Sequence, residues 1–438
     1  MNPKRRTKRL SAQPDSVIER SEFRFETMAV VLRTWPTNCS AFIRHPAFGA
    51  IVLLIVSLTV YMQGRYAPVA DSIPQELLPI TLLREHNFDF DEFAHEFTRE
   101  NERLPYFFVE KNNHVLSFYG IVPGLLNVPA YLIADALGLD LLANRARLTK
   151  WTTGVVSALS VAFMYLVSAR ICARRRSALL ISLLYAFATC CWSVTANTLW
   201  WNGPSLLFLS IALMLLLQPN SGLAPLCGFF LGMAVWNRPT NIAFALPLAT
   251  YMLLYNGNRK LFVASAAVPA ILMAWYSYVY WGDIWTLGQG HRLGTHEFSG
   301  SILNGIAGLL FSPSRGLFIY SPIFLFSLPV LVGALFRREL PPLYRYLSIG
   351  LLLDLLLTAK WRVWWGGWSF GYRMLIELLP GLTVLLALAW ERKIVRPWRL
   401  QVAFWPTVLV SFYIHFLGAF YYPSDWNYSP RSVDRDRA

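Results

Sequence analysis

The stretch from Lys360 to Arg373 concentrates the side chains best suited to bind a phosphate-bearing lipid. Three cations, Lys360, Arg362 and Arg373, accompany four tryptophans. Guanidinium and ammonium groups pair with phosphate oxygens, and aromatic rings can support a sugar ring or an isoprenoid chain. An aromatic belt at a membrane interface would explain the tryptophans but not the cations. We expect Lys360 and Arg373 to bind the phosphate and a set of aromatic side chains to contact the substrate or its lipid: Trp364, Trp365, Trp368, Tyr372 and, from another loop, Tyr66.

Asp71 is the candidate catalytic base. It follows the first apolar run of the chain and lies between Pro68 and Pro74. Sugar transfer to a hydroxyl acceptor needs a group that accepts the acceptor's proton, and carboxylates do this in many enzymes. An aspartate in a turn or at a helix start is the alternative, and spacing alone favours it.

Two further arginines lie next to helix-breaking residues at expected outer membrane edges. Arg238 precedes Pro239, and Arg315 lies within the Ser312–Gly316 cluster, which opens an apolar run. An arginine at a membrane boundary is costly unless something satisfies it, and helix starts favour anions. Both are candidate ligands of the donor phosphate, with snorkelling to the lipid headgroups as the alternative for Arg238.

Metal ligands are less well supported by the sequence. Asp89, Asp91 and Glu92 could bind a divalent cation, but acids in this spacing also mark the first turn of a helix, and that interpretation is preferred. Lys111 and His114 could face a phosphate or simply lie at the interface. The polar residues His291, Arg292, His296 and Glu297 have no recognisable ligand spacing. The sequence therefore predicts no metal site, and its five cysteines are interpreted as free thiols.

The elements that position these residues are membrane helices. Of the 438 residues, 55% are hydrophobic and only 15% are charged, whereas soluble domains carry about 25% charged residues. A bilayer core requires about 20 apolar residues per helix. We expect an all-α, polytopic transmembrane bundle of about 11–12 spans, drawn from the runs 46–63, 118–138, 148–168, 177–194, 203–217, 223–236, 240–255, 261–281, 317–336, 344–359, 374–390 and 401–420.

Basic loops set the expected orientation, because lysine and arginine favour the cytoplasmic side. The +14 net charge comes from basic residues in short loops between apolar runs, where they set the orientation. We therefore do not expect nucleic acid as a partner. The basic loops 1–44, 169–176, 256–260, 337–345 and 391–399 are expected inside. If all the predicted runs cross, however, the loop 169–176 falls outside. Either 118–138 does not cross fully, or one boundary between runs is wrong.

The expected organisation is one membrane domain between two polar tails. Residues 1–45 are expected to form a disordered, basic, cytosolic tail, and residues 421–438 a polar C-terminal tail. The domain at 46–420 has a first outer loop at 64–117, with short amphipathic helices near 77–84 and 91–99, and further outer loops at 282–316 and 360–373.

Three segments resemble membrane glycosyltransferases of the GT-C fold, in the set that includes protein mannosyltransferases and aminoarabinose transferases: Gly64–Pro79, Ser312–Pro322 and Trp364–Pro380. The resemblance, which is strongest to bacterial members, implies that the first outer loop supplies the catalytic carboxylate, and Asp71 occupies the matching place. It also implies that basic residues at outer helix ends bind the carrier phosphate, a role that Arg315 and Arg373 fit best, followed by Arg238 and Lys360. Many relatives carry two adjacent acids here, whereas Ser72 follows Asp71, which argues against a metal-bound version.

Together these features predict an inverting hexosyl- or pentosyltransferase. It would move a sugar from a polyprenyl-phosphate donor to a lipid, glycan or protein acceptor at the periplasmic face of the inner membrane. The donor is a substrate, so no cofactor is expected, and no nucleotide-binding loop is present. A lipid or polysaccharide transporter or flippase is the alternative. Transporters often show repeats and midplane charges, whereas this sequence shows no repeat and collects its polar residues on one side.

Overall fold

The computed structural model describes residues 45–67, 69–98, 104–218, 221–285, 295–395 and 397–422. The expected basic tail lies outside these residues, apart from His45, and so does all of the expected C-terminal tail beyond residue 422. His291, Arg292 and the side chain of His296 also lie outside them.

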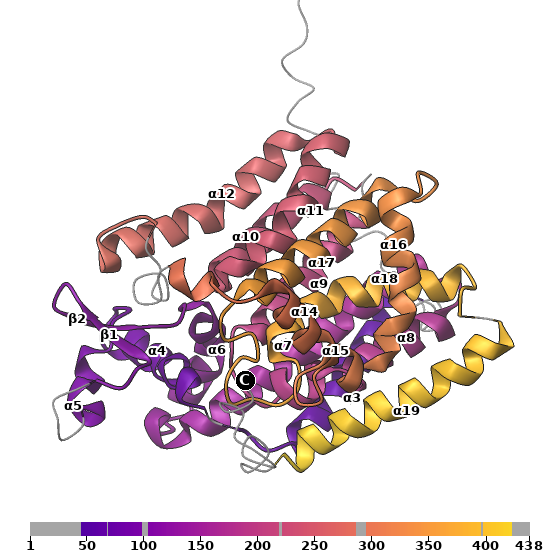
Figure 1. Cartoon of the computed structure of the whole chain (residues 1–438). Helices are drawn as coiled ribbons and strands as arrows, with labels where there is room; N and C mark the ends of the chain where they lie inside the picture. Colours follow the sequence, from indigo (N-terminus) through magenta and orange to yellow (C-terminus); the bar gives the residue numbers. More distant parts are fainter. Residues whose placement is uncertain are drawn as a thin grey trace, which may run out of the picture. The chain divides into compact units, whose positions relative to one another are not determined.

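Helices make up most of the described chain, and its strands form one small hairpin, β1–β2 (Figure 1). In chain order the elements are α3 (Pro46–Gln63), α4 (Ile73–Arg84), α5 (Ala94–Phe97), β1 (Phe108–Lys111), β2 (His114–Ser117), α6 (Val122–Ala136), α7 (Leu141–Ile171), α8 (Arg175–Phe187), α9 (Asn202–Leu216), α10 (Cys227–Asn237), α11 (Ile242–Tyr255), α12 (Arg259–Tyr276), α14 (Ile302–Phe311), α15 (Leu317–Tyr320), α16 (Leu328–Phe336), α17 (Pro342–Lys360), α18 (Leu379–Glu391) and α19 (Trp398–Phe420).

Six of the described helical segments are long and apolar enough to cross a membrane: 46–63, 141–171, 259–281, 342–360, 373–391 and 398–420. Four shorter apolar helices lie at 202–216, 224–237, 302–311 and 322–336. Backbone groups cannot stay unpaired in lipid, so such runs must be helical. The chain is an integral membrane protein with the predicted all-α bundle, and every apolar run predicted from the sequence contains a helix.

The most buried helices lie at the centre of the packing. Helix α9 is buried at nearly every position, and so is α18. In contrast, the apolar segments 259–281 and 398–420 are mostly exposed. An apolar surface of this extent fits contact with lipid. Helices α9 and α18 therefore lie in the core of the bundle, and α12 and α19 lie at its edge.

Helix α6 is the element on which the parity of the predicted topology depends. It has 15 residues, about 22 Å at 1.5 Å per residue, which is shorter than a bilayer core of about 30 Å. It packs against α4 and α7 and is not among the six candidate spans. Without a crossing at 118–138, α3 and α7 are consecutive crossings, and the basic loop at 169–176 falls on the same side as the other basic loops.

Two elements in the expected outer loops differ from the prediction. The stretch 77–84 is helical, but it belongs to α4, which is largely buried against α6 instead of lying on a membrane surface. Part of the expected loop 282–316 forms the apolar helix α14, which packs against α17. Tertiary packing explains both differences: α4 buries more than half of its residues, and Gly305 of α14 lets that helix lie close to Ala359 of α17.

Candidate active site

Asp71 lies in a short 3-10 turn, Ala70–Ser72, between α3 and α4. Ser72 fixes this turn, because its hydroxyl donates to the Val69 carbonyl at 2.9 Å. The same hydroxyl lies 3.2 Å from Glu76, and burial raises the pKa of that carboxyl group. The turn holds the Asp71 side chain at 14% exposure, accessible but mostly enclosed.

Three side chains surround the Asp71 carboxylate. The hydroxyl of Tyr106 donates to Asp71 Oδ1 at 2.5 Å, and Tyr119 lies close enough to interact electrostatically with this carboxylate. Arg373 Nη2 lies 3.5 Å from Asp71 Oδ2. Burial first, and then the charge of Asp71, raises the pKa of both tyrosines. Both hydroxyls therefore remain protonated donors at neutral pH.

Arg373 begins the 3-10 segment Arg373–Leu378 that leads into α18. Its side chain is 10% exposed, and its guanidinium carbon lies 4.0 Å from the centre of the Trp200 ring. Its Nε is buried and has no hydrogen-bond acceptor among the described residues. Buried donors are normally paired, so this guanidinium has room for an additional oxygen ligand.

A buried ion pair lies beside Arg373. Arg238 Nη1 is 2.5 Å from Glu377 Oε2, and both side chains are buried. Asn202 links the two arginines, because its Nδ2 donates to Glu377 Oε1 at 2.8 Å and to the Arg373 carbonyl at 3.2 Å. Both arginines therefore have a carboxylate partner: Arg238 pairs closely with Glu377, and Arg373 lies 3.5 Å from Asp71.

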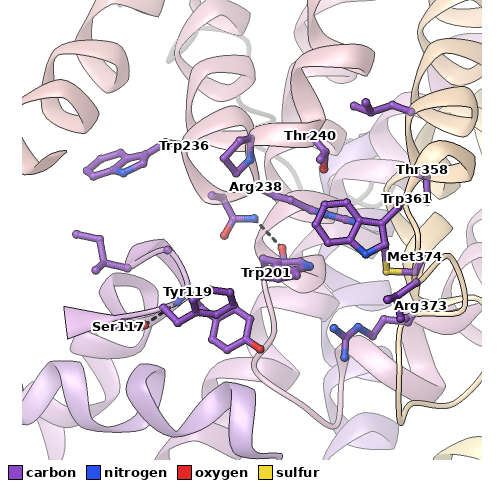
Figure 2. A pocket seen from close by; sticks show the side chains of 18 of the residues that line it. Ser117, Tyr119, Trp201, Trp236, Arg238, Thr240, Thr358, Trp361, Arg373 and Met374 are labelled. Carbon is purple, nitrogen blue, oxygen red and sulfur yellow. Dashed lines mark hydrogen bonds between the residues drawn. The ribbon is translucent and has the colours of Figure 1, made fainter. Parts of the chain in front are cut away.

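A cavity of about 500 Å³ opens next to these groups (Figure 2). Arg238 and Arg373 both line it, and so does Tyr119, which connects the cavity to Asp71. Eight further aromatic residues line it: Phe118, Trp201, Trp236, Tyr276, Trp281, Trp285, Phe298 and Trp361. Apolar walls with a few convergent polar groups are typical of ligand sites.

Arg315 is placed differently from Arg238 and Arg373, and it does not line this cavity. It is only 1% exposed. Its guanidinium donates to the carbonyls of Ser314, Trp365 and Gly367 at 2.9, 3.1 and 3.0 Å. In the structure Arg315 therefore holds the turn that contains Gly366 and Gly367, and these two glycines line the cavity.

The aromatic residues chosen from the sequence also lie outside the cavity lining. Tyr66 donates to Glu76 Oε1 at 2.5 Å. Tyr372 is buried, with its hydroxyl 2.7 Å from Ser321 Oγ. The rings of Trp364 and Trp365 meet edge to face, and Trp368 is exposed. Lys360 ends α17, where its carbonyl accepts from Gly300.

Sequence reasoning did not single out several side chains that build the site. Tyr106 and Tyr119 contact Asp71, and Trp200 and Trp201 lie against the two arginines. Aromatic density near these positions was the only available signal. It does not tell which rings face the site, because that depends on the packing of distant loops.

The fold is the GT-C fold of membrane glycosyltransferases. The chain matches ArnT from Cupriavidus metallidurans, solved bound to undecaprenyl phosphate, at 15% identity and a TM-score of 0.50, covering 87% of this chain and 76% of that one. It also matches the oligosaccharyltransferase AglB from Archaeoglobus fulgidus, solved with an inhibitory peptide and a dolichol-phosphate, at 13% identity and a TM-score of 0.47, covering 85% and 55%. No protein-family model matches the sequence, and no curated protein matches it significantly.

Proposed function

We propose that this protein is a glycosyltransferase that moves a sugar from a polyprenyl-phosphate donor to an acceptor hydroxyl, with inversion at the anomeric carbon. The ion pair between Asp71 and Arg373, of which Arg373 lines the cavity, carries the proposal. The Asp71 carboxylate and the Arg373 guanidinium, which are far apart in the sequence, lie 3.5 Å from each other. The GT-C fold and the lipid phosphate bound to ArnT support the same kind of donor.

Arg373 is the proposed ligand of the donor phosphate. It lines the cavity, and its buried Nε has no acceptor among the described side chains and backbone groups. A guanidinium fork matches phosphate oxygens in shape and charge. Arg238 contributes positive potential from the same wall, although Glu377 already neutralises much of its charge.

Asp71 is the proposed general base. The acceptor oxygen attacks the anomeric carbon, and its proton passes to the Asp71 carboxylate. The bond between that carbon and the phosphate oxygen breaks, and the lipid phosphate leaves with the electron pair. Arg373 stabilises this leaving charge. The hydrogen bond from Tyr106 orients the carboxylate, and Tyr119 lies beside it.

We place the reaction on the outer, periplasmic face of the inner membrane, with the N-terminus in the cytoplasm. The loop that carries Asp71 lies opposite the basic loops once α6 is not counted as a crossing, and basic loops favour the cytoplasm. The apolar cavity wall formed by Trp201, Trp236 and Trp361 offers a surface for the sugar or the first isoprene units.

The decisive experiment is a transfer assay with the purified protein in detergent. Polyprenyl-phosphate sugars labelled in the sugar are supplied with membrane lipid, glycan and peptide acceptors. We expect release of unlabelled lipid phosphate and label in one acceptor class, and neither in Asp71→Asn. Transport of the labelled lipid across liposomes without any transfer would instead support the flippase alternative.

A further inference from the structure

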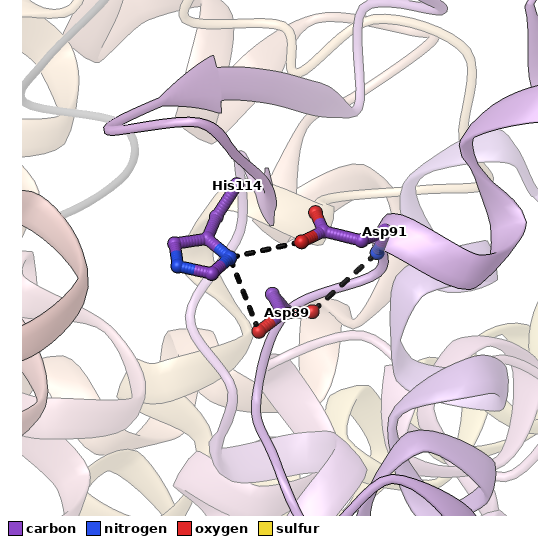
Figure 3. A group of neighbouring side chains, drawn as sticks. All are labelled: Asp89, Asp91 and His114. Carbon is purple, nitrogen blue, oxygen red and sulfur yellow. Dashed lines mark hydrogen bonds and ion pairs between the residues drawn. The ribbon is translucent and has the colours of Figure 1, made fainter.

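We propose that Asp89, Asp91 and His114 form a binding site for a divalent transition-metal ion, outside the cavity. The three ligand atoms lie within 4.8 Å of one another (Figure 3). None of these residues lines the cavity. The proposal does not depend on the transferase function, because it concerns a different group of side chains.

The hairpin β1–β2 brings these residues together. Its turn residues, Asn112 and Asn113, both have left-handed backbone, with φ of 50° and 62°, as the tightest hairpin turns require. His114 is therefore the first residue of the returning strand.

The loop that carries both aspartates lies beside this strand. Phe90 N donates to the Val115 carbonyl at 2.8 Å, and Val115 N donates to Asp91 Oδ1 at 2.6 Å. The second oxygen of Asp91 is left facing His114. Backbone hydrogen bonds thus fix the two segments at the spacing that the three side chains require.

The distances fit a metal ion. His114 Nδ1 lies 2.9 Å from Asp91 Oδ2 and 3.4 Å from Asp89 Oδ2. Zinc binds nitrogen and oxygen ligands at about 2.0–2.1 Å in tetrahedral geometry, which separates two ligand atoms by roughly 3.4 Å. One pair already has this separation, and the other needs to open by only about half an ångström.

The charges of the group call for a cation. Asp89 is 3% exposed, and within the described part of the chain no lysine or arginine pairs with either aspartate. Asp89 Oδ2 receives no hydrogen bond and faces His114 only as an ion pair. Burying a carboxylate without a cation is costly. A divalent ion between the three side chains would remove that cost.

Asn87 supplies an independent observation at the same place. Its Nδ2 donates to Asp89 Oδ1 at 3.1 Å, whereas its own Oδ1 is buried without a hydrogen-bond partner in the described structure. An unsatisfied buried acceptor therefore lies on the same amide group that contacts Asp89.

The ligand types define the metal class. Imidazole nitrogen suits zinc and its neighbours in the transition series, whereas carboxylate oxygen also suits manganese. Two carboxylates and one imidazole therefore favour Zn²⁺ or Mn²⁺ over Mg²⁺ and Ca²⁺. The His114 side chain is 45% exposed, so an ion can enter from solvent.

The proposed ion would stabilise the loop that faces Asp71. Tyr106, which donates to Asp71, lies two residues before β1, and Tyr119 lies two residues after β2. Both tyrosines therefore lie next to the β1–β2 hairpin, in which His114 is the first residue of β2. A metal ion at this point would stabilise the hairpin and would take no part in the reaction.

The test is metal binding by the full-length protein in detergent, after removal of metal with a chelator. Zn²⁺, Mn²⁺, Mg²⁺ and Ca²⁺ are added separately, and bound metal is measured by calorimetry and elemental analysis. We expect one Zn²⁺ or Mn²⁺ per chain and a higher Tm of the wild-type protein on binding. Asp89→Asn and His114→Ala should each weaken binding at least about tenfold.

Two further variants control for misfolding. Asp135→Asn removes an acid that pairs with Arg84 at the surface and should bind metal as the wild type does. His114→Cys should retain Zn²⁺, because a thiolate is a good zinc ligand. A wild-type protein that binds neither Zn²⁺ nor Mn²⁺ would overturn the proposal, and so would equal binding by the wild type and His114→Ala.

Discussion

Asp71 Oδ2 and Arg373 Nη2 lie 3.5 Å apart, although the two residues come from the first and the last polar loops of the membrane domain. Three interactions hold this pair in place: the Tyr106 hydroxyl on the carboxylate, Tyr119 beside it, and the Trp200 ring under the guanidinium. The ion pair places the proposed base, Asp71, next to the proposed phosphate ligand, Arg373, which lines the cavity. The predictions below test each part of this arrangement.

Asp71→Asn should abolish transfer while the protein still folds. An amide cannot accept the acceptor's proton, so we expect a loss of turnover of about 10²–10⁴-fold. The measurement is label transfer by purified protein with a matched thermal unfolding curve. Asp135→Asn, at the surface, is the control. If Asp71→Asn turned over substrate as fast as the wild type, Asp71 would not be the general base.

Arg373→Met should raise the KM for the lipid-phosphate donor about tenfold or more, because a charged hydrogen bond contributes about 1.5–3 kcal/mol. Arg315→Met is the matched comparison. Its guanidinium is already used by three backbone carbonyls, so its loss should lower thermal stability by at least about 2 kcal/mol. The opposite pattern would mean that Arg315 binds the phosphate.

Glu377→Gln should destabilise the protein by about 3–5 kcal/mol, because it leaves the buried Arg238 without its counter-ion. The double variant Glu377→Met with Arg238→Met removes both charges and should be more stable than Glu377→Gln. Thermal unfolding in detergent measures both. Equal stability of the wild type and Glu377→Gln would contradict the importance of this pair.

Gly366→Ala should impair donor binding more than Gly367→Ala. Both residues have positive φ, at 73° and 68°, where a side chain costs about 1–2 kcal/mol. A Cβ at Gly366 would also lie 2.7 Å from Met374, which lines the cavity, whereas one at Gly367 meets nothing within 4 Å.

Gly138→Ala is the control for backbone strain, because its φ is 69° and its surroundings are open. We expect all three alanine variants to lose similar stability, with only Gly366→Ala changing the KM for the donor. Equal KM values in the three would show that the Gly366 turn does not shape the cavity.

Tyr106→Phe should lower turnover about tenfold without changing the shape of the pH profile between pH 6 and 9. Burial raises the pKa of Tyr106. A raised tyrosine pKa contributes stability that is fully present below the unfolded value of about 10 and is lost only as the pH rises through the folded value. A basic limb below pH 9 that disappears in Tyr106→Phe would contradict this.

The amino-acid sequence determined the membrane architecture. Apolar runs of sufficient length must form helices in lipid, and each predicted run contains one. The resemblance of three short segments was enough to predict the GT-C fold. Local pattern also brought Asp71, Arg238 and Arg373 forward as candidates, since a charged side chain at a membrane edge needs a specific partner.

Only the tertiary structure decided which candidates meet. Spacing could not show that Arg315 faces three carbonyls, that Tyr106 reaches Asp71, or that His114 joins two aspartates. It also could not show that α6 is only 15 residues long and packs on α4 and α7. The physical reason is that helix formation in lipid follows from local composition, whereas the partner of a polar side chain depends on contacts between segments that are distant in the chain.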